Sequence, residues 1–209
     1  MKHCTNLLRL LCFCLVLCAV SAFASYQPRF STAGFYQLPE TGRSAYSMNP
    51  AWRFLCGKMP GAQSVDFEDK DWKLVSLPHG LELLPYEASG CINYQGEAWY
   101  RKHFTPQEEW KGKQLFLHFE AIMGKSKVWV NGQLVKEHFG GFLPVIADIT
   151  SYLRYGQDNV IAVWTDNSDD PSYPPGKAQD MLDFAYLGGI YRDCWLVAHN
   201  RVYILSLIH

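Results

Sequence analysis

The chain has 209 residues, of which 48% are hydrophobic and 15% aromatic, enough to bury the core of one domain but not the cores of two large ones. Its 19 basic and 20 acidic residues give a net charge of −1, which provides no electrostatic basis for binding nucleic acid or an anionic membrane. The low charge and the many aromatic residues also argue against a disordered chain.

The first segment of the chain is typical of a secretory signal peptide. Lys2 and Arg9 precede an apolar run at residues 10–20, and small alanines stand one and three residues before an expected cleavage site after Ala24. A run of about 11 apolar residues is too short for a helix that spans a bilayer, which needs roughly 20. The sequence therefore predicts a signal peptide over residues 1–24 and a mature chain that is secreted or periplasmic, with no membrane segment left after cleavage.

Cleavage would leave three of the seven cysteines, namely Cys56, Cys91 and Cys194. An odd number in an oxidising compartment allows at most one disulfide, and the sequence leaves its pairing open. Because no pair has the spacing of a zinc site, we expect no metal centre built on cysteine, and we expect at least one buried free thiol. Lipidation at Cys18 is a weaker alternative, because Leu17 is a poor residue before a lipidated cysteine.

The rest of the chain divides into an arm and one β-rich domain. Residues 25–50 contain three prolines and two glycines with little periodicity, and we expect an arm that lies on the domain or links it to the signal peptide. Over 51–209, short runs of β-branched and aromatic residues alternate with turn clusters, which is typical of an all-β sandwich. The predicted strands are Trp72–Leu77, Ala98–Phe104, Gln114–Glu120, Lys127–Val130, Gln133–His138, Asn159–Asp166, Cys194–Ala198 and Val202–Leu207, with short helical turns at Pro106–Lys111 and Ile149–Leu153.

The strongest local signal is Asn131-Gly132, which lies between the alternating runs 126–130 and 133–137. Both residue types tolerate positive φ angles, as a type I′ turn between right-twisted strands requires. The sequence therefore predicts a two-residue β-hairpin at this point.

One connection, from Asp166 to Ile190, is more than twenty residues long and contains no strand pattern. Long loops inside compact domains are uncommon and usually functional. Carboxylates accept hydrogen bonds from sugar hydroxyls, and aromatic rings cover the C–H face of a pyranose, so the loop's composition suits a sugar site. A solvated, Asp- and Pro-rich surface turn is the alternative. The acidic and aromatic residues concerned are Asp166, Asp169, Asp170, Asp180, Asp183, Tyr173, Phe184 and Tyr186.

Residue chemistry alone identifies no complete active site. The sequence has no G-x-S-x-G elbow, no glycine-rich phosphate loop and no histidine pair with zinc spacing. Glycoside hydrolysis needs two carboxylates about 5 to 9.5 Å apart, and no pair among the many acidic residues is marked for that role. We therefore predict no catalytic residue in this chain.

Seven runs in unbroken order carry a family resemblance: WRF (52–54), DWKLVSLPHG (71–80), GEAWYRKHF (96–104), LHFEAIMGKSKVWVNGQLVKEHFGGFLP (117–144), DITSYLRYGQDNVIAVWTDNSDD (148–170), PPG (174–176) and DFAYLGGIYRDCWL (183–196). Together they resemble the N-terminal sugar-binding domain of glycoside hydrolase family 2, the family of β-galactosidases, β-glucuronidases and β-mannosidases. The resemblance implies a jelly-roll β-sandwich, similar to galactose-binding domains. It also implies a β-galactosidase-like enzyme that, when complete, hydrolyses terminal β-O-glycosidic bonds with retention of configuration.

In that family both catalytic glutamates lie on a barrel that follows this domain, so the resemblance implies that the 209 residues alone are inactive and that the barrel is their partner. The apolar run Val202–His209 at the end of the sequence is expected to mark a truncated chain. A stand-alone carbohydrate-binding module remains the alternative function.

The resemblance also implies particular site residues. Asp183 matches an aspartate that reaches the catalytic pocket, holds the terminal sugar and, in some members, binds a monovalent cation. Gln95 and Asn93 lie near the position of a second sugar contact, an asparagine in the family. From the composition of the long loop rather than from the resemblance, Tyr186 is expected to contact the carbohydrate through its ring. We expect no organic cofactor, and at most Na⁺ or Mg²⁺ in the complete enzyme.

Two further features are expected to maintain the fold. Gly140-Gly141 and Gly188-Gly189 are predicted to form tight turns or close backbone approaches, where a Cβ would clash. Arg192 and Asp193 resemble a structural ion pair at the start of a strand, beside an expected buried Ile190.

Overall fold

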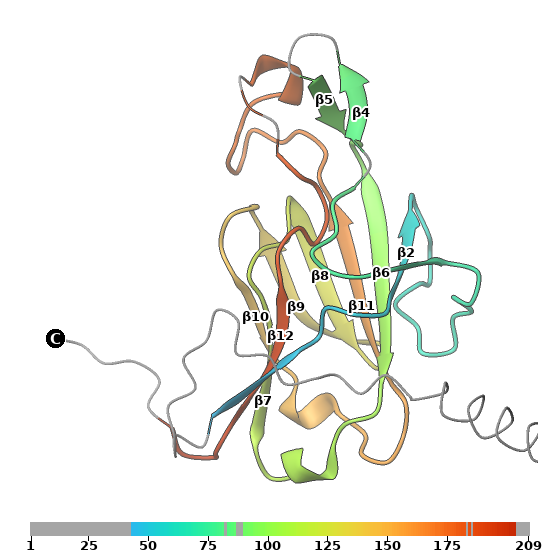
Figure 1. Ribbon diagram of the computed structural model, residues 1–209, viewed down its shortest axis with the longest axis vertical. Coiled ribbons are helices and arrows are strands. Elements are labelled where there is room, and N and C mark those ends of the chain that lie inside the picture. The colour runs from blue at the N-terminus through green and yellow to red at the C-terminus, as the bar shows by residue number, and fades with distance from the viewer. Residues whose placement is uncertain (1–42, 82, 87–89, 183, 185, 204–209) are drawn as a thin grey trace, which may run out of the picture.

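The computed structural model describes residues 43–81, 83–86, 90–182, 184 and 186–203, and the regular secondary structure of this part of the chain is almost entirely β-strand (Figure 1). Its strands are β1 (Ser44–Ser47), β2 (Trp52–Cys56), β3 (Lys73–Val75), β4 (Leu83–Tyr86), β5 (Gly90–Asn93), β6 (Glu97–Phe104), β7 (Gln114–Phe119), β8 (Lys125–Val130), β9 (Gln133–Phe139), β10 (Val145–Asp148), β11 (Asn159–Asp166) and β12 (Cys194–His199). Three 3₁₀ turns complete it: η1 (Glu108–Trp110), η2 (Thr150–Tyr152) and η3 (Gln179–Met181).

The strands form two packed antiparallel sheets, so the all-β sandwich expected from the sequence is confirmed. One sheet has the order β1-β12-β7-β10 and the other β3-β2-β6-β11-β8-β9, while β4 and β5 form a separate hairpin. Many neighbours in the sheets are far apart in sequence, as for β2 beside β6 and β11 beside β8. Alternation along β7 and β8 turns every second side chain into the core between the sheets. Bulky, fully buried members of this core are Trp52, Tyr100, Trp110, Leu115, Leu117, Phe119, Ile122 and Ile149.

The predicted hairpin is confirmed and has an additional role in the core. Asn131 and Gly132 have φ angles of 50° and 81°, both positive as a type I′ turn requires. The Asn131 side chain is also buried, and its Nδ2 donates to the Tyr152 carbonyl and to Asn159 Oδ1, each at 2.8 Å. The Val160 backbone N–H donates to Asn131 Oδ1 at 3.1 Å. The turn therefore joins β8 and β9 and fixes the entry to β11.

The structure departs from the predicted elements at both ends of the described chain. Residues 44–47, which the sequence places in the arm, form β1 and pair with β12, so the sandwich includes them. The short strands β4, β5 and β10, inside the domain, were also not predicted. At the other end, the predicted strand Val202–Leu207 is wrong over its described residues, because Val202 is 92% exposed in a bend and has no sheet partner. The remainder of that strand lies outside the described residues.

The glycine predictions are confirmed. Gly189 has a φ of +83°, and a Cβ there would overlap the Tyr100 hydroxyl. A Cβ on Gly141 would overlap the Met123 thioether. Both glycines thus permit close packing that a side chain would prevent.

The predicted Arg192–Asp193 ion pair is wrong. The described residues show no salt bridge between the two side chains. Asp193 Oδ1 instead accepts a hydrogen bond from Asn49 Nδ2 at 2.9 Å, and the Arg192 guanidinium lies 5.7 Å from the centre of the Tyr191 ring. The Asn49 Oδ1 also accepts a hydrogen bond from the Cys194 N–H. Asn49 is therefore held between Asp193 and Cys194, and it ties the β1–β2 connection to β12. Ile190 is fully buried, as expected.

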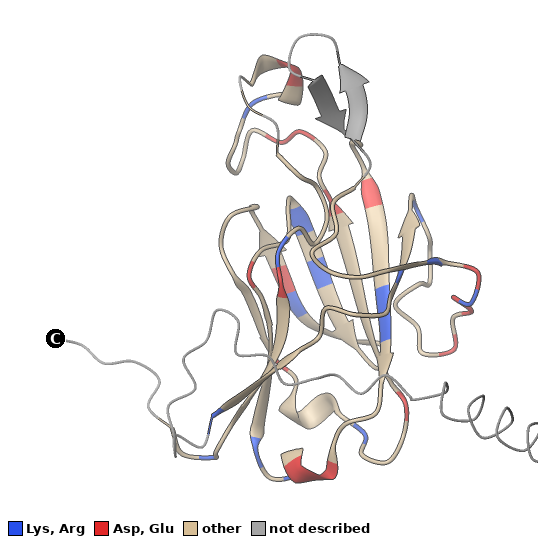
Figure 2. Ribbon diagram, viewed as in Figure 1, with Lys and Arg blue, Asp and Glu red and all other residues tan. Residues whose placement is uncertain are grey.

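Cys194 is a buried thiol without a disulfide, as predicted for at least one cysteine. Burial raises the pKa of this thiol. Cys56 is exposed, and the side chain of Cys91 lies outside the described residues. Along the described ribbon, basic and acidic positions are interspersed (Figure 2). No helix among the described residues is long and apolar enough to cross a membrane.

A buried charge cluster fixes the loop 57–72 on the outer face of the six-stranded sheet. Arg101 is fully buried, and its Nε donates to Asp69 Oδ2 at 2.7 Å. Its other nitrogens donate to loop carbonyls, those of Ala62, Ser64 and Phe67. Arg53 and His103 also contact the Asp69 carboxylate, at 3.3 Å and 2.9 Å. One carboxylate and one guanidinium therefore hold most of this loop in place.

Replacing Asp69 with asparagine is expected to reduce the loss of unfolding free energy that occurs when the pH falls from 7 to 3. Burial acts to raise the pKa of Asp69, but the hydrogen bonds from Arg101 and His103 outweigh it, and the net pKa is lowered. A lowered pKa in the folded state stabilises the fold above the unfolded pKa of about 4, and this contribution is lost as the pH falls further. Urea unfolding of the wild type and Asp69→Asn from pH 7 to pH 3 measures the effect. Parallel curves for the two proteins would contradict it.

Candidate functional site

Two segments far apart in sequence meet at one end of the sandwich. The loop from Asn167 to Gly189 follows β11, and residues 94–96 lead from the β4–β5 hairpin into β6; Figure 1 shows both at the same end of the molecule. Asn167, which is 2% exposed, joins them: its Oδ1 accepts from the Gly96 N–H at 3.1 Å, and its Nδ2 donates to the Tyr94 carbonyl at 2.6 Å. Gly188 lies so close to the Asn167 amide that a Cβ would overlap it. The start and the end of the loop are thus held against the same side chain.

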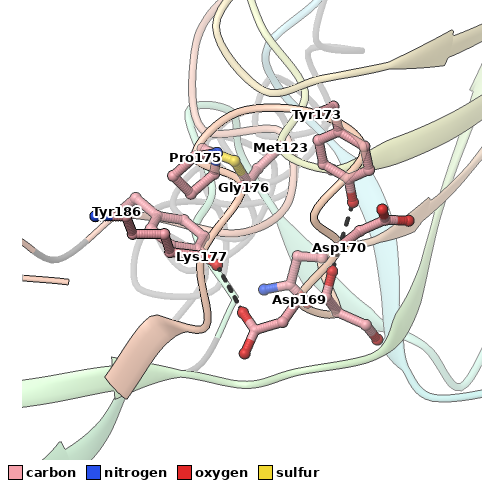
Figure 3. A pocket seen from close by; sticks show the side chains of 11 residues that line it. Met123, Asp169, Asp170, Tyr173, Pro175, Gly176, Lys177 and Tyr186 are labelled. Atoms are coloured by element: carbon pink, nitrogen blue, oxygen red, sulfur yellow. Dashed lines mark hydrogen bonds between the residues drawn. The ribbon is translucent and has the colours of Figure 1, made fainter. Parts of the chain in front are cut away.

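A network of polar side chains also links the loop to Gln95. Gln95 Nε2 donates to Gln179 Oε1 at 3.2 Å, and the Gln179 backbone N–H donates to the Asp169 carboxylate at 3.1 Å. The Tyr186 hydroxyl donates to Asp169 Oδ1 at 3.5 Å, and Figure 3 shows the two side chains facing each other. Burial and the nearby Asp169 carboxylate raise the pKa of Tyr186, although the hydrogen bond with Gln95 acts in the opposite direction, so the hydroxyl is protonated and available as a donor at neutral pH.

A second acidic residue anchors the loop to the sheet. Asp170 Oδ2 lies 2.7 Å from Lys125 Nζ on β8, and the Ser172 N–H and hydroxyl also donate to this carboxylate. These interactions, led by the one with Lys125, lower the pKa of Asp170. Burial and the nearby Asp170 and Asp166 carboxylates raise the pKa of Tyr173 to about 12. Asp170 is therefore occupied by loop and sheet donors, whereas Asp169 is an exposed carboxylate.

The hollow between these residues is small. It has a volume of about 10 Å³, room for about one water molecule, and the residues that line it include Met123, Asp169, Tyr173 and Tyr186 (Figure 3). Sites that enclose a small-molecule ligand have volumes of roughly 300 Å³ or more. The described loop therefore cannot enclose a sugar ring by itself, and it offers a polar and aromatic surface that forms one side of a site.

The structure brings two of the four predicted site residues together. Gln95 and Tyr186 both reach the network around Asp169 and Gln179. Asn93 is the last residue of β5, and its side chain lies outside the described residues. Asp183 also lies outside the described residues, so its predicted role stays a prediction.

Sequence reasoning missed the bracing residues. Gln179 gave no signal because nothing in a lone glutamine marks it as a site residue. Asn167 lies within the DNSDD run on which the resemblance partly rests, which was the one available signal. Lys125 lies just before the predicted strand Lys127–Val130, where a single charged residue gave no signal.

The expected cation finds no complete site in the described part of the chain. Among the described residues, no group of three or more His, Cys, Asp or Glu side chains is arranged to hold a metal ion. Asp169 is engaged by the Gln179 N–H and the Tyr186 hydroxyl. The described residues thus do not fit Na⁺ or Mg²⁺ by themselves.

Comparisons of the sequence with known proteins all point to one family. Residues 80–200 match the family model of the glycosyl hydrolases family 2, sugar binding domain. The chain is 37% identical to a β-galactosidase of Thermoanaerobacter pseudethanolicus over 164 residues, which cover 78% of this chain and 22% of that protein. It is 32% identical to a β-glucuronidase of Formosa agariphila over 174 residues, covering 78% of this chain and 18% of that protein.

A solved structure is similar to this chain in fold as well as in sequence. The β-glucuronidase 2 of Bacteroides uniformis, covalently bound to cyclophellitol-6-carboxylate aziridine, is 34% identical and superposes with a TM-score of 0.67 over 75% of this chain. The match spans 18% of that protein, so the chain corresponds to about a fifth of the length of its relatives. The family match includes β4 to β12, and with them Gln95 and the loop from Asn167 to Gly189. The chain therefore belongs to glycoside hydrolase family 2, as an N-terminal sugar-binding domain.

Proposed function

We propose that this chain supplies one wall of the sugar pocket in a secreted family 2 β-glycosidase of the β-galactosidase type, which hydrolyses terminal β-O-glycosidic bonds. The observation that carries the proposal is the convergence of the two loop segments on Asp169 and Tyr186, within the region that matches the family. A polar surface of this kind, too shallow to hold a sugar alone, is what a partial site requires. The partner that completes the site is a catalytic barrel, which carries both catalytic glutamates in the family resembled.

The loop's own residues have two tasks in this proposal. Asn167 and Gln179 hold the loop in one shape, because each joins it by hydrogen bonds to residues 94–96. Asp183 is the residue that touches substrate, by accepting a hydrogen bond from a hydroxyl of the terminal sugar. Tyr186 lies near Asp183 in sequence, but its side chain is only 9% exposed, so in this proposal it supports the wall through its hydrogen bond to Asp169 rather than by stacking on the sugar as the sequence suggested. Binding energy gained by such contacts positions the glycosidic bond for the barrel's carboxylates.

Two parts of the proposal concern the chain as a whole. The strand connections are those of a jelly roll, which the order of the two sheets favours, since most neighbours are not consecutive in sequence. The signal peptide over residues 1–24 directs the enzyme out of the cytoplasm. Large glycosides are found outside the cytoplasm, so the enzyme would meet them there. The substrate is a β-galactoside rather than a β-glucuronide, following the 37% identity to a β-galactosidase against 32% to a β-glucuronidase.

A chimera tests the role of Asp183. Residues 44–203 of this chain replace the aligned segment of the Thermoanaerobacter pseudethanolicus β-galactosidase, and kcat and KM are measured with aryl β-galactoside and aryl β-glucuronide. Hydrogen bonds to a charged group contribute about 1.5–3 kcal/mol, so Asp183→Asn is expected to lower kcat/KM roughly 10- to 150-fold. We expect the galactoside to be preferred.

Asp180→Asn is the matched control, since Asp180 is an exposed aspartate on the same loop and undergoes the same change of charge. Its kcat/KM should stay within about two-fold of the parent chimera, as for a surface change. Equal kcat/KM for both variants and the parent would overturn the role of Asp183, and a folded but inactive parent chimera would overturn the proposed wall.

A further inference from the structure

The outer face of the four-stranded sheet is buried, although it points away from the core. Every second side chain of β12 enters the core between the sheets, so Trp195, Val197 and His199 point outward. They are nevertheless only 1%, 6% and 9% exposed. Among the described residues, the apolar cluster of Trp195 and Val197 contains one further member, Ala45 on β1. Neighbouring strands cover the sides of an outward indole but not its outer surface, so its burial calls for a further layer of chain over this face.

A hollow lies on the same face. Its volume is about 250 Å³, which is less than the roughly 300 Å³ of a small-molecule site but more than the roughly 150 Å³ that accepts a benzene ring. Aromatic rings contact one another beside it, with the His199 ring centroid 5.4 Å from that of Phe116 and 4.3 Å from that of Tyr203. The residues that line the hollow include Arg43, Phe116, His118, Ile146, Val197 and His199. A hollow of this size and character fits one large apolar side chain.

The arm segment, residues 25–42, is joined to the chain at the edge of this hollow. It ends directly before Arg43, whose Nε donates to His199 Nδ1 at 3.3 Å. The large apolar residues of the segment are Tyr26, Phe30, Phe35, Tyr36 and Leu38. In an extended chain, Leu38 lies up to about 17 Å from Arg43 and Phe35 up to about 27 Å. Four strands are about 15 Å wide, so the segment is long enough to cross the whole face.

We propose that the arm segment docks across the outer face of the four-stranded sheet, with the stretch from Phe35 to Leu38 over Trp195 and one of its large side chains in the hollow. The covalent link to Arg43 keeps the segment at a high local concentration beside the hollow, which a second molecule in dilute solution does not match. The sequence left open whether the arm lies on the domain or only links it to the signal peptide, and this proposal selects the first.

Both outer faces of the sandwich are then covered by the chain itself. The loop 57–72 covers the six-stranded sheet, and the arm segment covers the four-stranded sheet. The end of the sandwich that carries the loop from Asn167 to Gly189 is left as the open surface. The proposal does not depend on the sugar site, because the arm acts on a sheet face and the site lies beyond the strand ends.

Photo-crosslinking of the full 209-residue chain tests the position of the arm. The photoreactive residue p-benzoylphenylalanine replaces Ile146, which lines the hollow and is 47% exposed. In the control it replaces Leu74 on β3, which is 65% exposed on the outer face of the other sheet. After irradiation and digestion with trypsin, position 146 should be linked to the peptide of residues 30–43, which lies between the cleavage sites at Arg29 and Arg43. The yield of this link from position 74 should be about ten-fold lower.

Thermal unfolding tests whether the arm contributes to stability. The triple variant Phe35→Ser, Tyr36→Ser and Leu38→Ser should lower the Tm by about 5–10 °C, because apolar contacts over the face and in the hollow are lost. Leu143→Ser, at a position that is 68% exposed, is the control and should stay within about 2 °C of the wild type.

Three results would overturn the proposal: no link from position 146 to the peptide 30–43, an equal link from position 74, or a triple variant that unfolds at the wild-type temperature. A link from position 146 to a second copy of the chain, seen as a dimer on a denaturing gel, would also overturn it and would assign the face to self-association.

Discussion

Replacing Arg101 with methionine is expected to lower the free energy of unfolding by about 3–5 kcal/mol, because it leaves a buried carboxylate without its main partner. The Arg101 side chain is fully buried, and that of Asp69 is 6% exposed. The substitution also removes the donors of three loop carbonyls, so it releases the loop 57–72 from the sheet. Methionine has a similar length, which keeps a cavity from dominating the effect.

Urea unfolding at neutral pH measures the loss. Arg53→Met is the matched control: Arg53 contacts the same carboxylate at 3.3 Å, but its side chain is 31% exposed, so the cost should be about 1 kcal/mol. The double variant Arg101→Met with Asp69→Leu should recover part of the stability, since no buried charge is left unpaired. If the Arg101 variant loses no more than the Arg53 variant, the buried pair does not hold the loop.

Changing Asn159 to aspartate is expected to cost about 3–5 kcal/mol at neutral pH, although the two side chains have nearly the same shape. Asn159 is fully buried and uses every hydrogen-bonding position. Its Nδ2 donates to the carbonyls of Arg154 and Gln157, at 2.7 Å and 2.9 Å. Its Oδ1 accepts from the Arg154 N–H and from Asn131 Nδ2, each at 2.8 Å. An aspartate would place a charged oxygen against two carbonyl oxygens.

The pH dependence identifies the cause. Burial and the two carbonyls disfavour the charged form, so the new carboxyl group would have a raised pKa in the folded state, and the loss should shrink as the pH is lowered. Asn200→Asp, at an exposed position just after β12, makes the same chemical change and should stay within about 0.5 kcal/mol of the wild type. A loss at Asn159 that does not vary with pH would point to altered packing rather than charge.

Much of the fold could be predicted from the sequence because its local signals agree with the final structure. The Asn131-Gly132 turn and the alternating strands around it fix their own pairing. In contrast, β1 reads Ser-Ala-Tyr-Ser, too short and too polar to be recognised without its partner β12. Its strand character comes from a partner about 150 residues away, and no local pattern reports that.

The candidate site, like the fold, could be predicted from the sequence only in part. The long loop and its acidic and aromatic residues were visible in the sequence, and so was the need for glycine at Gly188 and Gly189. The link from Gln95 to Gln179 was not visible, because it joins residues 84 positions apart through side chains with no distinctive spacing. The buried Arg101–Asp69 pair was equally hidden, since charged residues on a strand ordinarily face solvent.

The pairing of β1 with β12 also has a consequence for how the protein behaves in solution. All six residues of β12 are buried, and four of them, from Trp195 to Ala198, are paired with β1, which covers the side of β12 that does not pair with β7. A strand of this kind, if left uncovered, is a template on which strands of other molecules add, and such addition leads to aggregation. Four residues near the start of the described chain thus protect solubility, although they supply little of the apolar core.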